Sequence, residues 1–427
     1  MSLPHESPAG LDQAAALGSS DLDVESFLDA LHRRHRATRS TDIGYPAATD
    51  IDYSRVDELA DGLWNNVGDP RTDPQSGNHT KSAERALLDW AGELFGFPPG
   101  DRWGYVTTGG TEGNHAALHA ARNSFPVDGR GRTTAIGYYS AAAHYSVPKI
   151  FEFLGVPACK VNADDKGEMD YDHLAGLVAL RANRPAIVVA SVGTTMTEAV
   201  DDVDRIAGVL RAMGVRDSYL HVDAALSGIP LALDGALSLA QAESVAVSGY
   251  KFFGTRRICG LVIGRHAHRT GPHIAYIATR DTTVSGSRDG LGALQMWYAV
   301  AVLGNDGHRA RAAAARDLAR YAAKRLTESG WPAWRHPWAM TVVFATPPPV
   351  VTEKWNLANA DGISHFICMP GRTYWQVETF VADVVSAARQ RKPAPVQVSL
   401  MPRPRLNGGP MQHPSGSMQH PSLTVTA

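Results

Sequence analysis

A lysine near the middle of the chain is the residue best placed to do chemistry. Lys251 follows the apolar run 245–247 and the turn formed by Ser248 and Gly249. Burying an ammonium group at the end of a strand costs free energy, so a lysine at such a position is expected to have a chemical role. Its most useful reaction is a Schiff base with an aldehyde, and pyridoxal 5′-phosphate (PLP) is the commonest biological one. Taken alone, Lys251 is more simply interpreted as an exposed turn residue.

A glycine-rich run, Thr-Thr-Gly-Gly-Thr-Glu-Gly-Asn at 107–114, could hold the phosphate of such a cofactor. It lies between a predicted strand and a predicted helix. Glycines let backbone N–H groups approach an anion, and the N-terminus of a helix adds a favourable dipole. The run is not a Walker loop, because no Gly-Lys-Ser/Thr follows. A helix-capping turn with Thr111 as the N-cap residue is an equally simple interpretation.

Three further strand ends carry the other groups that a PLP site needs. Asp223 ends a strand, and an anionic partner keeps the pyridine nitrogen protonated, which improves the ring as an electron sink. Asp223 precedes Lys251 by 28 residues (251 − 223), enough for one helical crossover and one strand. The small Ala225 would let the ring lie flat, His144 could stack on it, and the Gly-Thr-Thr segment 193–195 offers hydroxyl groups. Each of these also has an ordinary interpretation as a turn, a cap or a solvated side chain.

Alternating strands and helices must position these residues. Helical runs at 114–123 and 203–213 separate strand-like runs, which lie at 104–106, 133–139, 186–192, 219–222, 245–247 and 260–263. This alternation indicates an α/β domain with a mostly parallel sheet and a ligand site at the carboxyl ends of the strands. One strand end would then carry a phosphate loop, and others a stacking histidine, a carboxylate and a lysine.

The predicted elements divide the chain into four parts: a disordered or arm-like N-terminal segment (1–42), a large PLP-binding domain (43–307), a small C-terminal α+β domain (308–392) and a disordered tail (393–427). Helical patterns occur at 24–35, 53–64 and 82–97 in the first two parts. The small domain contains predicted helices at 308–329 and 374–389 and predicted strands at 340–345 and 364–369. The tail repeats Met-Gln-His-Pro-Ser twice, which is too few copies for a repeat architecture.

Composition excludes several other classes of protein. The 427 residues carry a net charge of −2, which gives no electrostatic reason to expect nucleic acid or an anionic membrane as partner. No apolar run approaches the length of a transmembrane helix, and the N-terminus lacks the pattern of a secretory signal. Cys159, Cys259 and Cys368 lack the spacing of metal ligands, so no metal site is predicted. We therefore expect a soluble cytoplasmic protein.

Together these segments resemble the group II PLP-dependent amino-acid decarboxylases, in particular the branch with bacterial histidine decarboxylase, plant serine decarboxylase and valine decarboxylase. The family's blocks Gly-Thr-Glu-Gly-Asn, His-Tyr-Ser-Val, Gly-Thr-Thr and Asp-Ala-Ala-Leu occur here in order. The similarity runs from about 44 to 384 and includes a Gly-Ser-Arg block at 286–288 and the strand that begins with Ser364 and His365. The resemblance implies the aspartate-aminotransferase-like architecture of fold-type I, and a homodimer with active sites at its interface.

The resemblance also implies a role for each matching residue. Lys251 would bond the cofactor aldehyde, and Asp223 would pair with the pyridine nitrogen. His144 would stack on the ring, and Thr194 would lie near the ring oxygen. Three further residues would hold the phosphate: Gly110, Thr111 and Ser248.

Tyr276 matches the tyrosine of the family's mobile loop. The resemblance implies that it reprotonates the substrate carbon after CO2 leaves, often in the partner subunit's site. In relatives with phenylalanine at this place the outcome shifts to oxidative aldehyde formation, so Tyr276 favours simple decarboxylation. A packing aromatic at a subunit interface is the alternative interpretation.

Three segments depart from the family pattern. Tyr250 stands where the family has a histidine directly before the lysine, and a phenol cannot act as an imidazole acid or base near neutral pH. Residues 255–259 replace a more apolar, proline-containing turn, and 289–292 replace an Asn-Gly-His block. These changes keep two alternatives open: oxidative deamination or aldol-type cleavage of an amino acid on the same scaffold, and a non-enzymatic PLP-fold scaffold.

The segment before the helical run at 82–97 bears on the choice of substrate. Asn78 and His79 lie where this branch places a substrate-side loop, and Tyr250 is a third substrate-side candidate. The pattern around His79 is closer to the serine and valine members than to the histidine member. The sequence therefore predicts decarboxylation of an L-amino acid to an amine and CO2. The expected substrate is small and neutral (serine- or valine-like), with histidine next.

Overall fold

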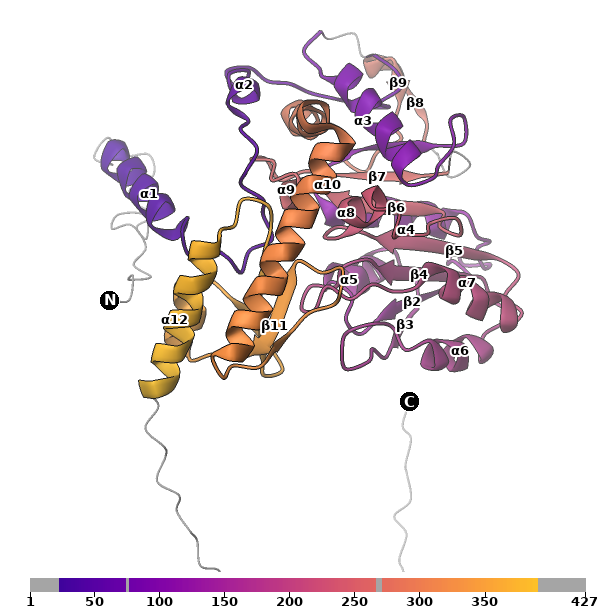
Figure 1. The fold of residues 1–427 in the computed structure, drawn as a ribbon. Helices are drawn as coiled ribbons and strands as arrows, with labels where there is room; N and C mark the ends of the chain where they lie inside the picture. Colours follow the sequence, from indigo (N-terminus) through magenta and orange to yellow (C-terminus); the bar gives the residue numbers. More distant parts are fainter. Residues whose placement is uncertain (1–22, 74–76, 266–270, 391–427) are drawn as a thin grey trace, which may run out of the picture. The chain divides into compact units, whose positions relative to one another are not determined.

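The computed structural model describes residues 23–73, 77–265 and 271–390. Its largest element is a seven-stranded sheet in the order β1-β7-β6-β5-β4-β2-β3 (Figure 1). The strands are β1 (Trp103–Thr107), β2 (Ile136–Ser140), β3 (Ala158–Val161), β4 (Ala186–Ser191), β5 (Ser218–Asp223), β6 (Ser244–Ser248) and β7 (Gly260–Gly264). Strands β2 to β6 pair in parallel, and β7 pairs antiparallel with both β6 and β1. Strand β1 therefore runs parallel to β6, and the predicted α/β architecture is confirmed.

Helices cover both faces of this sheet (Figure 1). They are α3 (Lys81–Leu94), α4 (Gly110–Asn123), α5 (Ser146–Phe153), α6 (Tyr171–Ala179), α7 (Val203–Ala212), α8 (Gly228–Leu233) and α9 (Gly249–Phe252). Ile187 and Val189 of β4 pack in one apolar cluster with Phe151 of α5. Val188, between them in the sequence, packs in another cluster with Ile206 of α7. Because both faces are buried, the central strands are nearly continuous apolar runs rather than alternating ones.

A second, antiparallel sheet follows, in the order β10-β11-β13-β12. Its strands are β10 (Ala333–Trp334), β11 (Thr341–Ala345), β12 (Ala358–Ala360) and β13 (Ile363–Ile367), with α11 (Pro349–Lys354) and α12 (Tyr374–Gln390) beside them. Phe344, Phe366 and Phe380 lie in its apolar core. The long helix α10 (Gly290–Glu328) is interrupted at Gly304, whose φ of 60° is not helical. The predicted domain division at 307/308 lies just beyond this interruption and stays a prediction.

Several elements differ from the sequence predictions, among them a helix in the N-terminal part and an edge strand of the large sheet. The helix predicted at 53–64 is reduced to α2 (Ser54–Asp57). The sequence does not predict β3, an edge strand in which Lys160 is exposed and only Val161 is fully buried, so that its pattern is weak. The helix predicted at 24–35 forms as α1 (Val24–Thr38). The predicted disorder of the tail at 393–427 concerns residues outside the described ranges.

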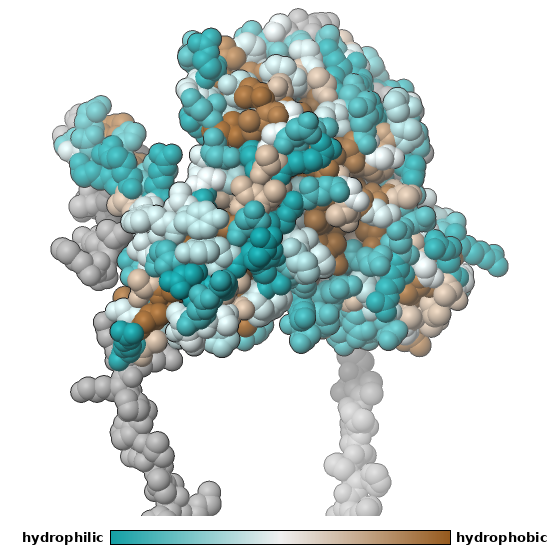
Figure 2. Space-filling view, in the orientation of Figure 1, coloured by the Kyte–Doolittle hydropathy of each residue, from teal (hydrophilic) through white to brown (hydrophobic). Residues whose placement is uncertain are grey.

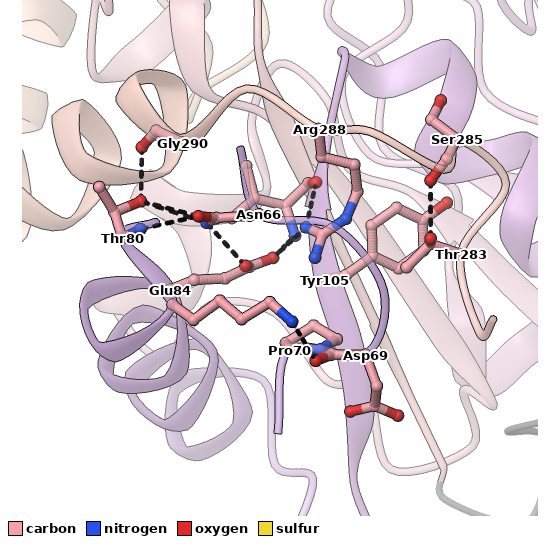
Figure 3. Close-up of polar contacts among 12 residues, drawn as sticks. Asn66, Asp69, Pro70, Thr80, Glu84, Tyr105, Thr283, Ser285, Arg288 and Gly290 are labelled. Atoms are coloured by element: carbon pink, nitrogen blue, oxygen red, sulfur yellow. Dashed lines mark hydrogen bonds and ion pairs between the residues drawn. The ribbon is translucent and has the colours of Figure 1, made fainter. Parts of the chain in front are cut away.

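A buried ion pair fastens the segment before α3 to β1 (Figure 3). It joins Arg288 and Glu84, whose side chains are 2% and 0% exposed. The Arg288 guanidinium also donates to the carbonyl oxygens of Val106 (3.1 Å) and Gly68 (3.0 Å). The Glu84 carboxylate accepts from the backbone N–H of Val106 (2.8 Å) and from Asn66 Nδ2 (2.9 Å). Both charges are thus compensated without water.

Neighbouring polar contacts extend this attachment to the start of α10. Thr80 Oγ1 donates to the carbonyl oxygen of Gly290 at 2.7 Å. Lys81 Nζ donates to the carbonyl oxygens of Asp69 (2.8 Å) and Thr72 (2.7 Å). Burial lowers the pKa of Lys81 to about 8. Buried polar side chains therefore hold the loop before α3 and the N-terminus of α10 together.

A comparison of two arginine ion pairs, one buried and one exposed, gives a direct test of stability. We expect Arg288→Ala to lower the free energy of unfolding by about 3–5 kcal/mol, because Glu84 is left as an uncompensated buried charge. Arg55→Ala is the control, since Arg55 and Glu58 form a pair that is 78% and 59% exposed. Its expected loss is below about 1 kcal/mol. Urea denaturation measures both, and equal losses for the two variants would contradict the role given to Arg288.

A buried histidine gives a pH-dependent test. His308 packs against Phe252 and Phe253, with ring centroids 5.8 and 5.1 Å away. Its Nε2 lies 3.0 Å from the carbonyl oxygen of Ala299, and Arg311 Nη1 lies 2.9 Å from its Nδ1. A carbonyl only accepts and a guanidinium only donates, so the ring is neutral with its proton on Nε2. Burial lowers the pKa of His308 to about 4, with Arg311 adding to the effect.

The sign of the pH effect follows from that shift. The unfolded chain takes up a proton on this histidine near pH 6.5, and the folded chain only near pH 4. Stability that is present above pH 6.5 is therefore lost as the pH falls toward 4. Between pH 7 and 4.5 we expect His308→Gln to lose about 2–3 kcal/mol less stability than the unchanged chain. Parallel losses in urea denaturation at the two pH values would contradict the neutral state of His308.

Candidate active site

The carboxyl ends of β1, β2, β4, β5 and β6 surround one cavity of about 330 Å³. They meet there because parallel strands end at the same edge of a sheet. Nine residues that the sequence singles out line this cavity: Gly110, Thr111, His144, Thr194, Asp223, Ala225, Ser248, Tyr250 and Lys251. The structure thus brings these residues together, and their individual roles stay predictions.

Lys251 lies in α9, the short helix that directly follows β6. Burial lowers the pKa of Lys251, although the negative charges of Asp223 and Glu198 oppose the shift. A lowered pKa increases the fraction of neutral amine, which is the form that attacks an aldehyde. Lys251 therefore has the environment that Schiff-base chemistry requires.

The turn between β1 and α4 is shaped for an anion. A Cβ atom on Gly110 would lie 2.8 Å from Ser248 Oγ and 3.3 Å from Ala225 Cβ, so only glycine leaves this space open. Gly109, rather than Thr111, is the N-cap residue of α4, and Thr111 lies in the first helical turn. The N–H groups of that turn are available to a phosphate. The interpretation of Thr111 as a capping residue is therefore wrong.

The carboxylate of Glu112 stabilises the same turn by accepting hydrogen bonds from it. This carboxylate accepts from the backbone N–H (2.7 Å) and the hydroxyl (2.6 Å) of Thr108, and from the hydroxyl of Tyr105 (3.1 Å). The N–H of Ser285 donates to it at 3.3 Å, which ties the segment before α10 to the cavity wall (Figure 3 draws Tyr105 and Ser285). Burial alone would raise the pKa of Glu112, but the hydrogen bonds outweigh it and the pKa is lowered. Glu112 is thus an ionised part of the wall.

His144 follows β2 and is neutral at pH 7. Its Nδ1 accepts from the backbone N–H of Ser146 (3.3 Å) and lies 2.8 Å from Ser146 Oγ. Because an N–H group only donates, Nδ1 is unprotonated and Nε2 carries the proton. Burial lowers the pKa of His144, with Asp223 opposing. A neutral ring with a fixed tautomer suits both stacking and proton transfer.

Asp223 ends β5 and receives two hydrogen bonds. Asn114 Nδ2 donates to one oxygen at 2.7 Å, and the backbone N–H of Ala225 donates to the other at 3.2 Å. Ser191 lies opposite Asp223 in the register of β4 and β5. Its buried hydroxyl lines the cavity and has no hydrogen-bond partner among the described residues. Such a group requires a partner from a ligand or water.

The loop after β4 is held by Glu198, whose side chain is buried and whose backbone is strained. Glu198 has a φ of 56°, a left-handed conformation that costs a non-glycine residue energy. Its carboxylate accepts from Ser227 Oγ (2.8 Å) and from the backbone N–H groups of Met340 (3.0 Å) and Thr341 (2.7 Å). Burial raises the pKa of Glu198. The contacts fasten the start of β11 to the loop that carries Thr194.

Three predicted site residues do not line the cavity. Tyr276 lies in a 3₁₀ turn (Ala275–Ile277) between β8 (His273–Ile274) and β9 (Thr279–Arg280), and it is 86% exposed. Asn78 and His79 lie in the segment before α3, and neither lines the cavity. The carbonyl oxygen of Asn78 accepts from the N–H of Asn65 (2.9 Å), and His79 Nδ1 accepts from the N–H of Lys81 (3.3 Å). Any role for these residues in catalysis requires a second chain or a movement.

Several residues that line the cavity are not singled out by residue-by-residue sequence reasoning, Asn114 and Ser191 among them. Asn114 ends the glycine-rich block, so its position was visible, but its contact with Asp223 was not. Ser191 had no motif at all. Its only sequence signal is that it ends a strand beside the one that ends in Asp223. Tyr250, by contrast, lines the cavity as expected, stacks on Tyr45 at 6.3 Å between ring centroids, and has a pKa raised by burial.

The cavity fits PLP. The space beside Gly110 and the first turn of α4 would take the phosphate, and Asp223 would take the protonated ring nitrogen. The unpartnered Ser191 hydroxyl adds a hydrogen-bonding group, and Lys251 supplies the amine. Within residues 23–73, 77–265 and 271–390, no cluster of three or more His, Cys, Asp or Glu side chains is placed to hold a metal ion. In the same ranges no helix is long and apolar enough to cross a membrane.

Known proteins resemble this chain closely. The conserved domain of pyridoxal-dependent decarboxylases matches residues 45–332. A histidine decarboxylase of Acinetobacter baumannii is 36% identical over 352 residues, which cover 80% of this chain and 90% of the relative. A histidine decarboxylase of Mesorhizobium japonicum is 36% identical over 371 residues, which cover 85% and 98%.

A solved structure supports the fold. L-methionine decarboxylase from Streptomyces sp. 590 superposes with a TM-score of 0.78 at 23% identity, covering 86% of this chain and 95% of that one. The predicted fold-type I architecture, family and cofactor are confirmed. The chain therefore belongs to the pyridoxal-dependent decarboxylase family, and it is a PLP-dependent amino-acid decarboxylase.

Proposed function

We propose that the chain decarboxylates an L-amino acid with an uncharged side chain, either histidine or a small serine- or valine-like one. The observation that carries this proposal is the charge of the cavity wall. Among the described residues that line it, Lys251 is the only lysine and there is no arginine, whereas Glu112 and Asp223 are carboxylates. A substrate with a second carboxylate would lack a cation there. The identities of 36% to histidine decarboxylases make histidine the first substrate to test.

The cavity residues divide the work. PLP supplies an electron sink for the electron pair left on Cα when CO2 departs. Lys251 would bond the cofactor aldehyde, Asp223 would keep the ring nitrogen protonated, and His144 would stack on the ring. Ala225 would leave room for a flat ring, and Thr194 would offer its hydroxyl to the ring oxygen. Three residues would hold the phosphate: Gly110, Thr111 and Ser248.

A proton must replace CO2 on Cα, and two residues can supply it. His144 holds its proton on Nε2, since Nδ1 accepts from the N–H of Ser146. Tyr276 is the second donor, and its 86% exposure leaves it accessible to the cavity of another chain. We assign the step to Tyr276 of a partner subunit, with His144 orienting the substrate.

A homodimer is part of this proposal. Large apolar side chains are exposed at several places: Ile258 (67%) at the cavity, Tyr276 (86%) between β8 and β9, and Val24 (51%) and Leu28 (43%) on α1. On the face drawn in Figure 2, apolar residues form separate brown patches between hydrophilic ones. Ile258 also lines the cavity, so a second chain that covers it would complete the site. We infer a cytoplasmic location, which the three unpaired cysteines support.

The proposed reaction is tested by product identification. PLP-loaded protein is incubated in air with histidine, serine, valine and glutamate separately, and products are identified by mass spectrometry. We expect an amine from one of the first three and none from glutamate. Turnover of glutamate would overturn the assignment based on the cavity charge, and an aldehyde as sole product would overturn simple decarboxylation.

A lysine variant tests the cofactor bond. Lys251→Ala removes the only amine in the described wall of the cavity, so we expect loss of the yellow Schiff-base absorbance and a decrease in kcat of at least about 10⁴-fold. Lys160→Ala, on the exposed edge strand β3, is the control and keeps both. If Lys251→Ala retained the absorbance after gel filtration, another lysine would hold the cofactor.

A tyrosine variant tests the proton donor. We expect Tyr276→Phe to decrease amine formation by about 10²–10⁴-fold, because a positioned acid is lost, and to divert product to aldehyde in air. Tyr374→Phe, an exposed tyrosine on α12, is the control. Unchanged amine formation by Tyr276→Phe would assign the proton transfer to another residue.

A further inference from the structure

Behind Asp223 lies an unbroken chain of hydrogen bonds between buried residues. The hydroxyl of Tyr219 lies 3.0 Å from Ser244 Oγ, and Ser244 Oγ lies 2.8 Å from His221 Nδ1. His221 Nε2 lies 2.9 Å from Asn114 Oδ1, and Asn114 Nδ2 lies 2.7 Å from Asp223 Oδ2. All five side chains belong to buried residues of β5, β6 and α4. Only the Asp223 and Asn114 end of the chain reaches the cavity.

The chemistry of the groups fixes the direction of every bond. A carboxylate only accepts, so the amide that faces Asp223 must be the Nδ2 side of Asn114. Its oxygen then faces His221, and an amide oxygen also only accepts, so Nε2 of His221 must carry a proton. Burial lowers the pKa of His221 to about 4, so Nδ1 is unprotonated at neutral pH. Ser244 therefore donates to Nδ1, and Tyr219 donates to Ser244.

The consequence is that each donor points toward Asp223. Hydrogen bonds arranged head to tail polarise one another, which strengthens the last bond, from Asn114 to the carboxylate. Together with the N–H of Ala225, it favours the ionised form of Asp223. We call this chain of hydrogen bonds from Tyr219 to Asp223 the relay. Because His221 is neutral, the relay adds no positive charge that would compete with a protonated ring nitrogen. A positively charged imidazole at this position would pair with Asp223 in place of the ring nitrogen.

We propose that Tyr219, Ser244, His221 and Asn114 are positioning residues that orient Asp223 and keep it ionised toward the cofactor nitrogen. The inference rests on the role given to Asp223 in the proposed function. It predicts a fixed tautomer, with the His221 proton on Nε2, and a strong dependence of cofactor binding on Asn114.

The tautomer is measured by 15N NMR on chain labelled at histidine, with His221→Gln used only to assign the signal. With and without PLP, we expect His221 to remain neutral and protonated at Nε2 from pH 8 to pH 5. A proton on Nδ1, or a titration midpoint near the ordinary value of 6.5, would overturn the relay. The measurement needs no turnover, so it stands even if the chain does not act on the proposed substrates.

A matched pair of asparagine variants tests the effect on the cofactor. Asn114→Ala removes the donor to Asp223, whereas Asn123→Ala removes an exposed asparagine of the same helix that also contacts a histidine, His119. We expect the PLP dissociation constant to rise about tenfold or more for Asn114→Ala and less than about twofold for Asn123→Ala. We also expect kcat to fall more than KM changes. Equal PLP affinities of the two variants would overturn the proposal.

Tyr219→Phe keeps the aromatic ring and removes only the hydroxyl at the end of the chain most distant from Asp223. It is the alternative test variant if Asn114→Ala does not fold. We expect it to change the 15N signal of His221 and to weaken PLP binding less than Asn114→Ala. An unchanged signal would show that the bonds do not act as one chain. If the unchanged chain failed to bind PLP, the proposed function would fail, while the tautomer result would still decide the relay.

Discussion

Two ionisable groups, Lys251 and Asp223, are largely buried beside the same cavity, and the order of the strands in the large sheet brings them together there. A buried charge requires an opposite charge or hydrogen-bond donors. Asp223 meets that requirement with Asn114 and the N–H of Ala225, and its charge in turn opposes the fall in the pKa of Lys251. The two residues can approach because β5 and β6 are adjacent parallel strands. Burial and strand order together create an amine that is reactive and a carboxylate that stays ionised.

Two other buried carboxylates hold the loops around that centre. Glu84 pairs with Arg288 and fastens the segment before α3 and the approach to α10 against β1. Glu198 receives donors from the start of β11 and so joins the second sheet to the loop of Thr194. Neither carboxylate lines the cavity. Their positions explain how segments distant in sequence keep a constant relation to the cofactor site.

Much of this arrangement follows from local sequence. The apolar runs that become β1, β4, β5, β6 and β7 are visible because both faces of the sheet are covered, and the residues after them must meet at one edge. The exposed edge strand β3 lacks that signal, and the helix predicted at 53–64 stops after Asp57. Side-chain pairings such as Asn114 with Asp223, or the isolated hydroxyl of Ser191, depend on register between strands, which a single sequence does not display. Asn78, His79 and Tyr276 were inferred from resemblance, and within one chain they lie outside the cavity.

The central claim is that this cavity exchanges CO2 for a proton at Cα. The most direct measurement is mass spectrometry of the product formed by PLP-loaded protein in deuterium oxide with histidine, serine or valine. Our account predicts an amine with one deuterium on the carbon that bore the carboxylate. An amino acid that exchanges its Cα hydrogen but keeps its carboxylate, or an aldehyde as sole product, would contradict it.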